Sequence, residues 1–371
     1  GYRQCTVTLM DTTDPEITFD DAGMSNWVHY FNNQIRTWWD PQGNKDAFHA
    51  LIKRMKEDGK GKEYDCALGL SGGVDSSYLA YLVKREGLRP LIVHTDAGWN
   101  SDIAVRNIEN IVKTCGYDLF TIVIDWDEMA DLQRSFLRSG VPNQDIPQDH
   151  VIFAAFYGLA AKHGIKWVLS GRNMASESIL PKAWGHNALD LRHLNAIHRR
   201  FGERKLGKFP RMSLAKYGIL YSALKGMRVA WPLDLVAYDK SAAMGILEKE
   251  FGWKYYGGKH FESRWTRFFQ GWWLPSRFGF DKRLAHLSSL ILSGQMTREA
   301  ALEEMKQEYY TDTMMREDRD LILKKLNLTM DEWQHILDTP LRSHYDYPTS
   351  DWMTRTLSLG RNIVRKMGLL K

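Results

Sequence analysis

The sequence predicts an α/β fold: a parallel, twisted sheet flanked by helices, with a short N-terminal leader before it and a mainly helical C-terminal region after it. Two observations carry this prediction. From about residue 61, short apolar runs of strand length alternate with segments whose apolar residues recur at helical spacing. Polar, glycine-bearing turns follow three of these apolar runs, which is where parallel sheets bind their ligands. Such connections are right-handed crossovers, so helices should cover both faces of the sheet.

Three regions follow from this order. Residues 1–60 form the leader, residues 61–235 the α/β domain and residues 236–371 the helical C-terminal region. The leader is rich in turn residues until an amphipathic helix between residues 45 and 55. The C-terminal region has helical apolar spacing, and we expect its tail up to Lys371 to be helical as well.

Strands and helices can be placed from the apolar runs and their periodicity. The segment from residue 174 to 235 shows little strand character. In the C-terminal region, Thr329 and Glu332 have the spacing of a capping box, which starts a helix. The predicted strands are 66–70, 90–94, 119–125 and 166–169, and the predicted helices are 78–83, one from about 101, 127–139 and 148–163.

The most informative stretch is the turn after the first strand, Leu70-Ser71-Gly72-Gly73-Val74-Asp75-Ser76. It joins a buried strand to a helix, where backbone N–H groups lack intrahelical partners and the helix dipole is positive. Two adjacent glycines let the backbone approach an anion closely, and the serine hydroxyls add hydrogen-bond donors. The turn therefore predicts a phosphate site, with an ordinary glycine–serine turn as the alternative.

This turn differs from the Walker loop, which needs the pattern G-x-x-x-x-G-K-[ST] and its lysine. Instead, S-G-G-x-D-S resembles the pyrophosphate loop of enzymes that split ATP into AMP and pyrophosphate. The resemblance implies nucleotide-binding roles for Asp96 and Gly171, which follow two other strands, although Asp96 could equally be an ordinary helix N-terminal carboxylate. In the loop itself, the implied ATP-binding residues are Leu70, Ser71, Gly72, Gly73, Asp75 and Ser76.

Composition bounds the class of protein. The 371 residues are 44% hydrophobic and 26% charged, as in a globular protein long enough for two domains. We expect no membrane-spanning helix and no secretory signal, and the three cysteines do not make a disulfide framework, so we expect a cytoplasmic protein. The net charge of +5 suits small anionic substrates; without a long basic block we expect no nucleic-acid partner.

A polar and aromatic segment between residues 184 and 201 follows the predicted nucleotide site. Its side chains Asp190, Arg192 and His193 are candidates for substrate binding, and a solvated helix face is the alternative. We do not expect a metal site here, because His186 and His193 on one continuous helix would lie about two turns, roughly 10 Å, apart.

Further motifs extend the resemblance over nearly the whole chain. They are Met10-Asp-Thr-Thr-Asp14-Pro15, the loop above, Asp96-Ala-Gly-Trp-Asn-Ser101, Gly257-Gly-Lys-His-Phe-Glu-Ser-Arg264 and Asp281-Lys-Arg-Leu-Ala-His286. Together they resemble the N-acetyl sugar amidotransferase family, bacterial O-antigen and surface-sugar enzymes that are distantly related to the synthetase domain of asparagine synthetase.

The family resemblance implies a fold like that of the adenine nucleotide alpha hydrolases. It also implies a reaction: an acetamido group on a UDP-linked diacetamido uronic acid, or a related sugar, becomes an acetamidino group at the expense of ATP and ammonia. The cofactors implied are ATP and Mg²⁺, and the UDP-sugar is the substrate.

Many relatives carry a four-cysteine zinc cluster near the N-terminus, and this chain departs from that pattern. Only Cys5 remains, while Thr8, Met24 and Trp27 stand at the other positions. Because a structural zinc needs four ligands, we expect no zinc there. Packing of Trp27, Tyr30 and Phe31 is expected to hold the leader instead.

Single residues can be assigned to steps of this reaction. Ser71 and Asp75 belong to the loop, and Asp75 is the candidate Mg²⁺ ligand because hard cations prefer carboxylate oxygens. The loop lacks a lysine, so a remote cation must assist the departing pyrophosphate, with Lys259 as the first candidate and Arg264 as the second. His260 is a further candidate for substrate binding.

We expect the ammonia to come from a separate glutaminase subunit. An amino-terminal-cysteine glutaminase needs a cysteine at its mature N-terminus, whereas this chain shows Gly1 and a first cysteine at Cys5. Cys66 and Cys115 lack the glycine-rich context of a triad-type glutaminase. Two other functions stay open: an RNA thiolase of the same ATP-splitting class, and a non-catalytic nucleotide-binding scaffold.

Overall fold

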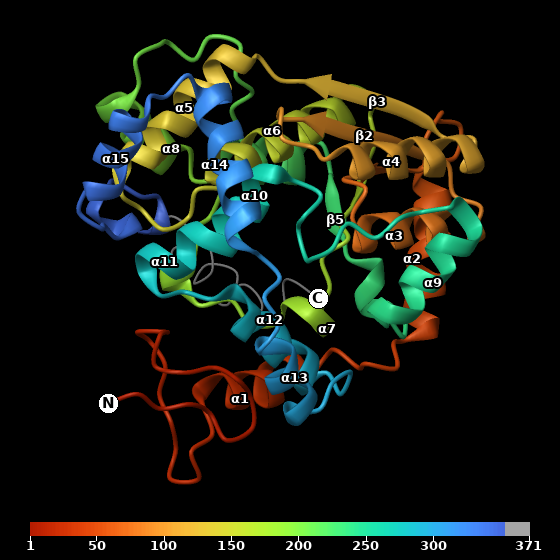
Figure 1. Cartoon of the computed structure of the whole chain (residues 1–371). Coiled ribbons are helices and arrows are strands. Elements are labelled where there is room, and N and C mark those ends of the chain that lie inside the picture. Colours follow the sequence, from red (N-terminus) through yellow and green to blue (C-terminus); the bar gives the residue numbers. More distant parts are fainter. Residues whose placement is uncertain (353–371) are drawn as a thin grey trace.

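The fold is built on a parallel sheet of five strands. In the computed structural model, which describes residues 1–352, the strands lie in the order β3-β2-β1-β4-β5 and every neighbouring pair is parallel. Figure 1 shows the sheet with helices packed around it. The predicted fold class is therefore confirmed. The strands are β1 (Cys66–Gly69), β2 (Pro90–Asp96), β3 (Asp118–Val123), β4 (Trp167–Leu169) and β5 (Arg228–Ala230).

Helices cover both faces of the sheet at β1, β2 and β4, which are buried on two sides, whereas the edge strand β3 is largely exposed. Side chains alternate along β1: Cys66 and Leu68 pack in the core under α3 and α9, whereas Ala67 packs against α6. The helices of this part are α2 (Lys45–Asp58), α3 (Val74–Arg85), α4 (Asp102–Cys115), α5 (Trp126–Ser139), α6 (Ile146–Lys162), α7 (Met174–Glu177), α8 (Leu191–Phe201) and α9 (Lys240–Phe251).

The C-terminal region adds a second group of helices with its own core. Trp265, Trp273 and Trp333 are fully or almost fully buried at its centre. The predicted capping box is confirmed, because Thr329 and Glu332 exchange hydrogen bonds at the start of α15. The helices are α10 (Arg264–Phe268), α11 (Leu274–Phe278), α12 (Lys282–Leu292), α13 (Arg298–Met305), α14 (Asp312–Leu326) and α15 (Met330–Asp338).

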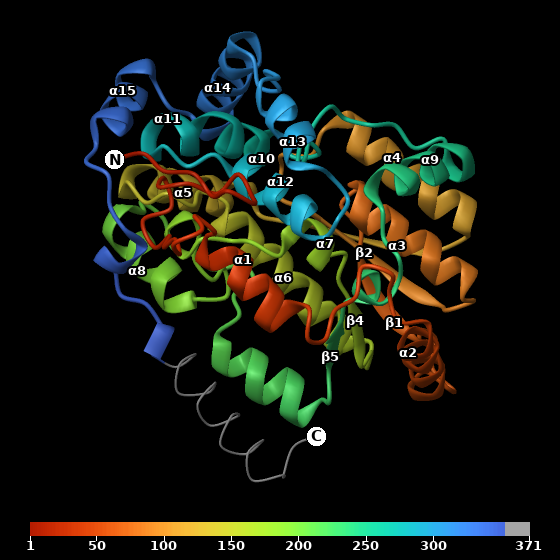
Figure 2. The same cartoon turned by 90° about the horizontal axis from the view of Figure 1, so that it is seen from below.

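The leader packs against this C-terminal group, and Figures 1 and 2 both place it beside α12 and α13. Leu9 N donates to Ser288 Oγ at 3.0 Å, and the Arg298 guanidinium donates to the Cys5 carbonyl at 3.3 Å. The remaining short elements are α1 (Asn26–Tyr30), η1 (Phe31–Ile35), η2 (Lys182–Trp184), η3 (Lys216–Leu224), η4 (Pro232–Leu235), η5 (Phe269–Trp273) and η6 (His344–Asp346).

Aromatic packing in the leader agrees only in part with the sequence expectation. Phe31 is fully buried and meets Trp39 edge-on, with ring centres 5.9 Å apart. Tyr30, in contrast, is exposed. The Cys5 sulfur is buried and accepts hydrogen bonds from the N–H groups of Thr8 and Ser25, so it helps to close the leader turn.

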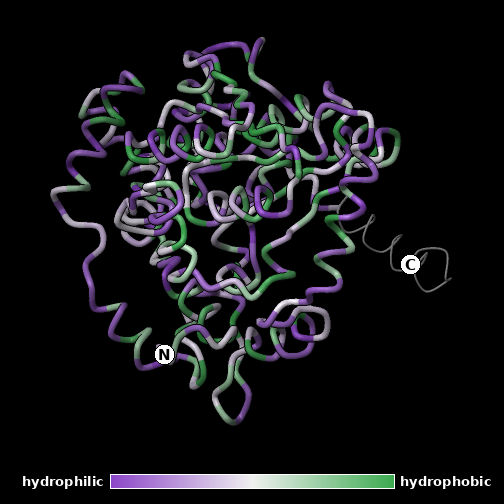
Figure 3. Tube along the Cα trace, turned by 90° about the vertical axis from the view of Figure 1, so that its right-hand side faces the viewer, coloured by the Kyte–Doolittle hydropathy of each residue, from purple (hydrophilic) through white to green (hydrophobic). Residues whose placement is uncertain are grey.

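The four predicted strands and the helices between them agree with the structure to within a few residues. The strand β5 was missed because it has three residues and lies in a segment with little strand character. The predicted helical tail up to Lys371 lies mostly outside the described residues. Figure 3 shows hydrophobic and hydrophilic stretches mixed along the described trace, and none of the helices within residues 1–352 has both the length and the apolar character that crossing a bilayer requires.

Candidate functional site

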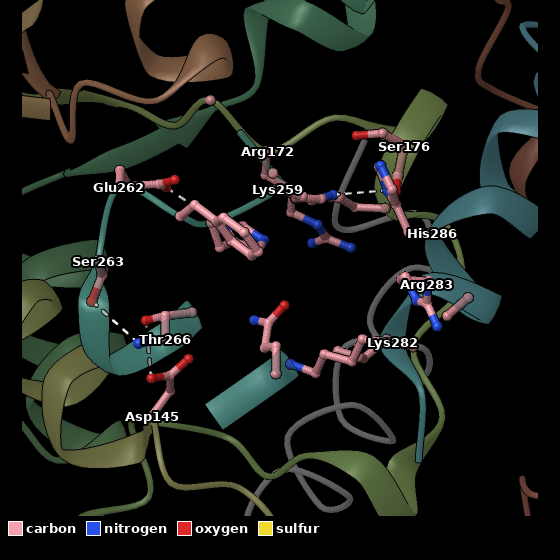
Figure 4. A pocket seen from close by; sticks show the side chains of 18 of the residues that line it. Asp145, Arg172, Ser176, Lys259, Glu262, Ser263, Thr266, Lys282, Arg283 and His286 are labelled. Carbon is pink, nitrogen blue, oxygen red and sulfur yellow. Dashed lines mark hydrogen bonds and ion pairs between the residues drawn. The ribbon is translucent and has the colours of Figure 1, made fainter. Parts of the chain in front are cut away.

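A large cavity opens at the carboxyl ends of β1, β2 and β4. Its volume is about 1820 Å³, and its wall is shared by the α/β domain, the C-terminal helices and part of the leader. Because β1 lies between β2 and β4, this is the edge at which parallel sheets bind ligands. Figure 4 shows basic and acidic side chains that gather around it from several elements.

The turn between β1 and α3 forms one part of the cavity wall. Ser71 N donates to Ser76 Oγ at 3.3 Å, and Gly73 N donates to Ser71 Oγ at 3.2 Å. Val74 N donates to the hydroxyl of Tyr256 at 3.2 Å. These three N–H groups thus converge on hydroxyl oxygens, which the oxygens of a bound phosphate could replace.

Two glycines hold the turn close to its neighbours. Gly72 has a φ of 80°, and a Cβ there would lie 2.4 Å from the carbonyl oxygen of Ala104. Trp253 Nε1 fixes the Gly72 carbonyl by a hydrogen bond of 3.0 Å. Gly171, after β4, packs so tightly on α3 that a Cβ would lie 3.0 Å from Ser76 N. A larger residue at either position would therefore displace the turn.

Asp75 lies in the first turn of α3 and is partly buried. Its Oδ1 accepts a short hydrogen bond from the Tyr238 hydroxyl and a longer one, 3.4 Å, from Asn173 Nδ2. Its Oδ2 receives none from the described residues. Burial and the negative charge of Glu177 raise the pKa of Asp75. A carboxylate with one oxygen available beside the predicted phosphate site fits Mg²⁺, bound directly or through water.

Lys259 faces the cavity from the segment before α10. Its Nζ lies 3.1 Å from Glu177 Oε1 and 3.0 Å from His286 Nδ1, the contact drawn as a dashed line in Figure 4. Burial keeps the pKa of His286 well below its usual value, so the ring is neutral. The same Nδ1 lies 2.8 Å from the Ser176 carbonyl, and a neutral ring can donate to it when Lys259 moves away. Lys259 can therefore turn toward a ligand without leaving His286 unpaired.

The cavity wall is rich in further basic groups, which suits a ligand with several negative charges. Burial lowers the pKa of Lys240 and of Lys282, so both hold their charge at a cost that a bound anion would reduce. The lysines and arginines in the wall besides Lys259 are Arg172, Lys182, Lys240, Lys282, Arg283 and Lys306.

Two carboxyl groups face the same cavity from the start of α6. Asp145 and Asp149 are four residues apart and so lie on one face of the helix. Asp145 Oδ1 accepts a hydrogen bond of 3.1 Å from Thr266 Oγ1, as Figure 4 shows. Burial, followed by the charge of Asp149, raises the pKa of Asp145 to about 8, and burial raises that of Asp149 to about 6. Near neutral pH the pair therefore carries about one negative charge.

The structure brings several predicted site residues together. Those that line the cavity are Leu70, Ser71, Gly171, Lys259 and His260. Gly72, Gly73, Asp75 and Ser76 belong to the same turn and lie just behind this wall.

Arg264 and Asp96 are placed differently. Arg264 Nε lies 2.5 Å from Asp318 Oδ1, and Arg267 shares the same buried carboxylate, so the guanidinium of Arg264 is engaged outside the cavity wall. Asp96 Oδ1 accepts hydrogen bonds from Gly98 N at 2.8 Å and from Asn100 Nδ2 at 3.1 Å, which closes the turn after β2.

Asp190, Arg192 and His193 also lie outside the cavity wall. Asp190 is buried and caps α8 by accepting from His193 N at 3.2 Å. His193 is fully buried, while Arg192 is exposed. The structure thus does not bring these three candidates to the cavity with His260.

The expectation that His186 and His193 lie far apart was wrong. It assumed one continuous helix, but α8 begins only at Leu191 and His186 belongs to the preceding turn. The two ring centres are 4.5 Å apart. The sequence signal for this break was Asp190, a residue type that favours the N-cap of a helix.

Sequence reasoning missed much of the charged cavity wall. Lys282 and His286 fall in the motif Asp281-Lys-Arg-Leu-Ala-His286, which carried the family resemblance but was given no role. The other missed residues sit in segments without a motif. They are Asp145, Asp149, Glu177 and Lys240.

Comparison with known proteins adds a curated relative and distant structural neighbours. The chain is 29% identical over 197 residues to the tRNA-specific 2-thiouridylase MnmA of Hahella chejuensis, which covers 48% of this chain and 52% of that protein. The chain thus spans about half the length of this curated relative.

Among solved structures, the chain is similar to the NH3-dependent NAD synthetase from Campylobacter jejuni. The TM-score is 0.29 and the identity 14%, and the similarity covers 42% of this chain and 72% of that one. NMN synthetase from Francisella tularensis gives a TM-score of 0.30, 15% identity and coverage of 56% and 92%.

A family model covers most of the C-terminal region. Residues 262–358 match the model described as "LPS biosynthesis protein WbpG-like, C-terminal domain". The match begins at Glu262, in the cavity wall, and includes Lys282, Arg283 and His286. This similarity to the WbpG-like C-terminal domain confirms the resemblance of the chain to the N-acetyl sugar amidotransferases.

Proposed function

We propose that this chain is the synthetase subunit of an ATP-dependent amidotransferase in lipopolysaccharide O-antigen biosynthesis. It converts an acetamido group of a UDP-linked diacetamido uronic acid into an acetamidino group and releases AMP and pyrophosphate. One observation supports this most: a single cavity joins the phosphate-binding turn at Ser71 to Lys282, Arg283 and His286 of the WbpG-like region.

The reaction needs ATP because an amide carbon is a weak electrophile and its oxygen a poor leaving group. In the proposed first step the acetamido oxygen attacks the α-phosphorus, and pyrophosphate leaves with the electron pair of the broken P–O bond. In the second step ammonia adds to the carbon of the O-adenylyl imidate, and AMP leaves as the C–O bond breaks. One proton is lost from the nitrogen. Positioning and charge stabilisation are the contribution of the protein.

The turn at residues 71–76 is proposed to hold the pyrophosphate. The N–H groups of Ser71, Gly73 and Val74 point to hydroxyl oxygens that phosphate oxygens can replace. Asp75 is the proposed Mg²⁺ ligand, since its Oδ2 receives no hydrogen bond from the described residues. Bound Mg²⁺ would neutralise charge on the triphosphate.

Lys259 is proposed to assist the departing pyrophosphate in place of a loop lysine. Lys259 forms an ion pair with Glu177, and the more highly charged pyrophosphate would replace Glu177 as its partner. The remaining basic residues of the wall, including Arg172 and Lys182, suit the diphosphate and the carboxylate of the sugar nucleotide. His260 stays a proposed substrate contact on the same wall.

Asp149 is proposed to accept the proton that ammonia loses. It lines the cavity beside Asp145, and a base with a raised pKa near neutrality is suited to proton transfer at working pH. The ammonia is proposed to come from a separate glutaminase subunit. Among the described residues no cysteine lines the cavity, which is consistent with that division of labour.

The second candidate function is an RNA thiolase, which the similarity to MnmA favours. Sulfur transfer needs a reactive, accessible thiolate. Cys5 and Cys66 are buried, and burial raises the pKa of the Cys66 thiol. Cys115 is partly buried with a raised pKa and lies outside the cavity wall. The cysteines of this chain therefore favour the amidotransferase over the thiolase.

Incubation of the full chain with ATP, Mg²⁺, ammonium and candidate UDP-diacetamido uronic acids tests the proposal. Mass spectrometry should detect replacement of one acetamido oxygen by NH, together with AMP and pyrophosphate in equal amounts. Sulfur transfer to RNA under matched conditions with a sulfur donor, and no change of any acetamido sugar, would contradict it and favour the thiolase.

A further inference from the structure

A cluster of metal-binding side-chain types lies beside α8, outside the cavity. His186 and Asp190 are almost fully buried, with side chains 3% and 1% exposed. Asp351 approaches them from the other end of the described chain. One potential ligand atom from each of the three residues lies within 4.8 Å of the others. Segments 160 residues apart in sequence are thus joined at this point, since Ser350 N donates to Asp190 Oδ2 at 2.7 Å.

The two side chains next to α8 already contact each other. Asp190 Oδ2 lies 2.9 Å from His186 Nε2 and accepts a hydrogen bond from Ser350 N, and Asp190 Oδ1 accepts one from His193 N. Its only ion-pair partner among the described residues is His186 Nε2, at 2.9 Å. Buried carboxylates commonly pair with a cation or coordinate a metal ion, and among residues 1–352 neither a lysine nor an arginine forms an ion pair with Asp190.

A further layer of imidazoles surrounds these ligands. Asn143 N donates to His344 Nε2 at 3.3 Å, so His344 carries its proton on Nδ1, which lies 3.1 Å from His193 Nε2. His193 must then be protonated on Nδ1, a buried atom with no hydrogen-bond partner among residues 1–352. The His193 ring is 4.5 Å from that of His186, centre to centre. This N–H is a donor, so a buried water beside the cluster, and not a cation, would satisfy it.

We propose that His186, Asp190 and Asp351 bind a divalent transition-metal ion of the zinc type. Imidazole nitrogen and carboxylate oxygen are established zinc ligands, with bonds of about 2.0–2.2 Å that place two ligand atoms of a tetrahedral site roughly 3.3–3.6 Å apart. The three atoms lie within 4.8 Å of one another, so binding would draw them together by up to about 1.5 Å. The ion fastens the chain around residue 351 to the start of α8, and it is independent of the proposed reaction in the cavity.

Zinc titration of the metal-stripped full chain against a chromophoric chelator tests this site. We expect one tightly bound equivalent, and loss of that equivalent in His186→Ala and in Asp351→Asn. The matched control is His335→Ala, which removes an exposed imidazole that does not belong to the cluster and should leave the stoichiometry unchanged. Circular dichroism of each variant shows that loss of metal is not loss of fold. Zinc should also raise the melting temperature of the wild-type chain and not that of the two variants.

Cobalt substitution distinguishes this site from the cysteines. Co²⁺ bound by nitrogen and oxygen gives visible d–d bands without a thiolate-to-cobalt charge-transfer band. The proposal is overturned if the wild-type chain binds no equivalent, if folded His186→Ala and Asp351→Asn both keep it, or if the bound cobalt shows thiolate ligation.

Discussion

Two parts of the cavity wall handle negative charge by different means. The turn at residues 71–76 offers backbone N–H groups and hydroxyls, held in place by Gly72 and Gly171. The wall built from residues 259–286 offers charged side chains, such as Lys259 and Lys282, whose electrostatics depend on burial and on each other. The first part is held by close backbone packing and carries the Asp75 carboxylate, and the second consists of charged side chains paired with one another. We infer that the turn positions the phosphates of the proposed substrate, while the charged side chains exchange partners during the reaction.

The largest effect should come from Asp75→Asn, in the turn. Loss of the proposed Mg²⁺ ligand should reduce pyrophosphate release by about 100- to 1,000-fold, as for removal of a central charge-stabilising group. The control is Tyr238→Phe, which removes the hydrogen bond to Asp75 Oδ1 and keeps the carboxylate. We expect a smaller loss there. Equal losses in the two variants would mean that Asp75 acts through its hydrogen bond rather than through a metal ion.

Asp149→Asn should act on the second step alone. Without the base, ammonium-dependent turnover should fall by about 100-fold near neutral pH, the low end of what a general base contributes. Pyrophosphate release from the first step should continue. The control is Asp127→Asn, the same change at an exposed carboxylate on α5.

The pH dependence of the wild-type reaction sharpens this assignment. Asp149 has a pKa raised to about 6 and must be ionised to accept a proton, so turnover at a fixed concentration of free ammonia should fall as pH drops through about 6. The groups that face it are Asp145, Lys282 and His260, with Glu262 acting through Asp145. Asp149→Asn should flatten the profile; an unchanged profile would rule out this base.

Lys259→Ala should reduce pyrophosphate release by roughly 10- to 100-fold, which corresponds to the loss of about 1.5–3 kcal/mol from one hydrogen bond to a charged group. The matched control is Lys254→Ala, an exposed lysine five positions earlier that lies outside the cavity wall. If both variants lose equal activity, Lys259 acts only through the general positive charge of the region.

Arg264→Ala should have the smallest effect on turnover and a clear effect on stability. Its guanidinium shares the fully buried Asp318 with Arg267, so its removal should lower the free energy of unfolding by about 1–3 kcal/mol. Thermal melting and pyrophosphate release measured on the same sample separate the two effects. A loss of activity as large as that of Lys259→Ala, without loss of stability, would restore Arg264 as a reaction residue.

The turn could be predicted from the sequence because all its parts are contiguous. Glycines, serines and Asp75 follow one strand directly, and strand and helix patterns on either side are independent signals. The strands β1 to β4 were predictable for the same reason. The strand β5 was not, because its three residues lie in a segment with little strand character.

The charged side chains of the cavity wall could not be predicted in the same way. Asp145, Glu177, Lys240 and Lys282 lie far apart in sequence, and only the tertiary fold brings them to one cavity. For Arg264 the sequence motif predicted a place in the cavity. In the structure its guanidinium forms an ion pair with Asp318, outside the cavity wall. Charged residues are long and mobile, so their partners are decided by packing rather than by local pattern.

Transfer of labelled oxygen tests the central proposal most directly. A UDP-diacetamido uronic acid with heavy oxygen in its acetamido group is incubated with the full chain, ATP, Mg²⁺ and ammonium. Attack of that oxygen on the α-phosphorus predicts that the label appears in the phosphate of AMP, with pyrophosphate unlabelled. Label that stays in the sugar, or a nucleotide product that is ADP with orthophosphate, would contradict the proposal.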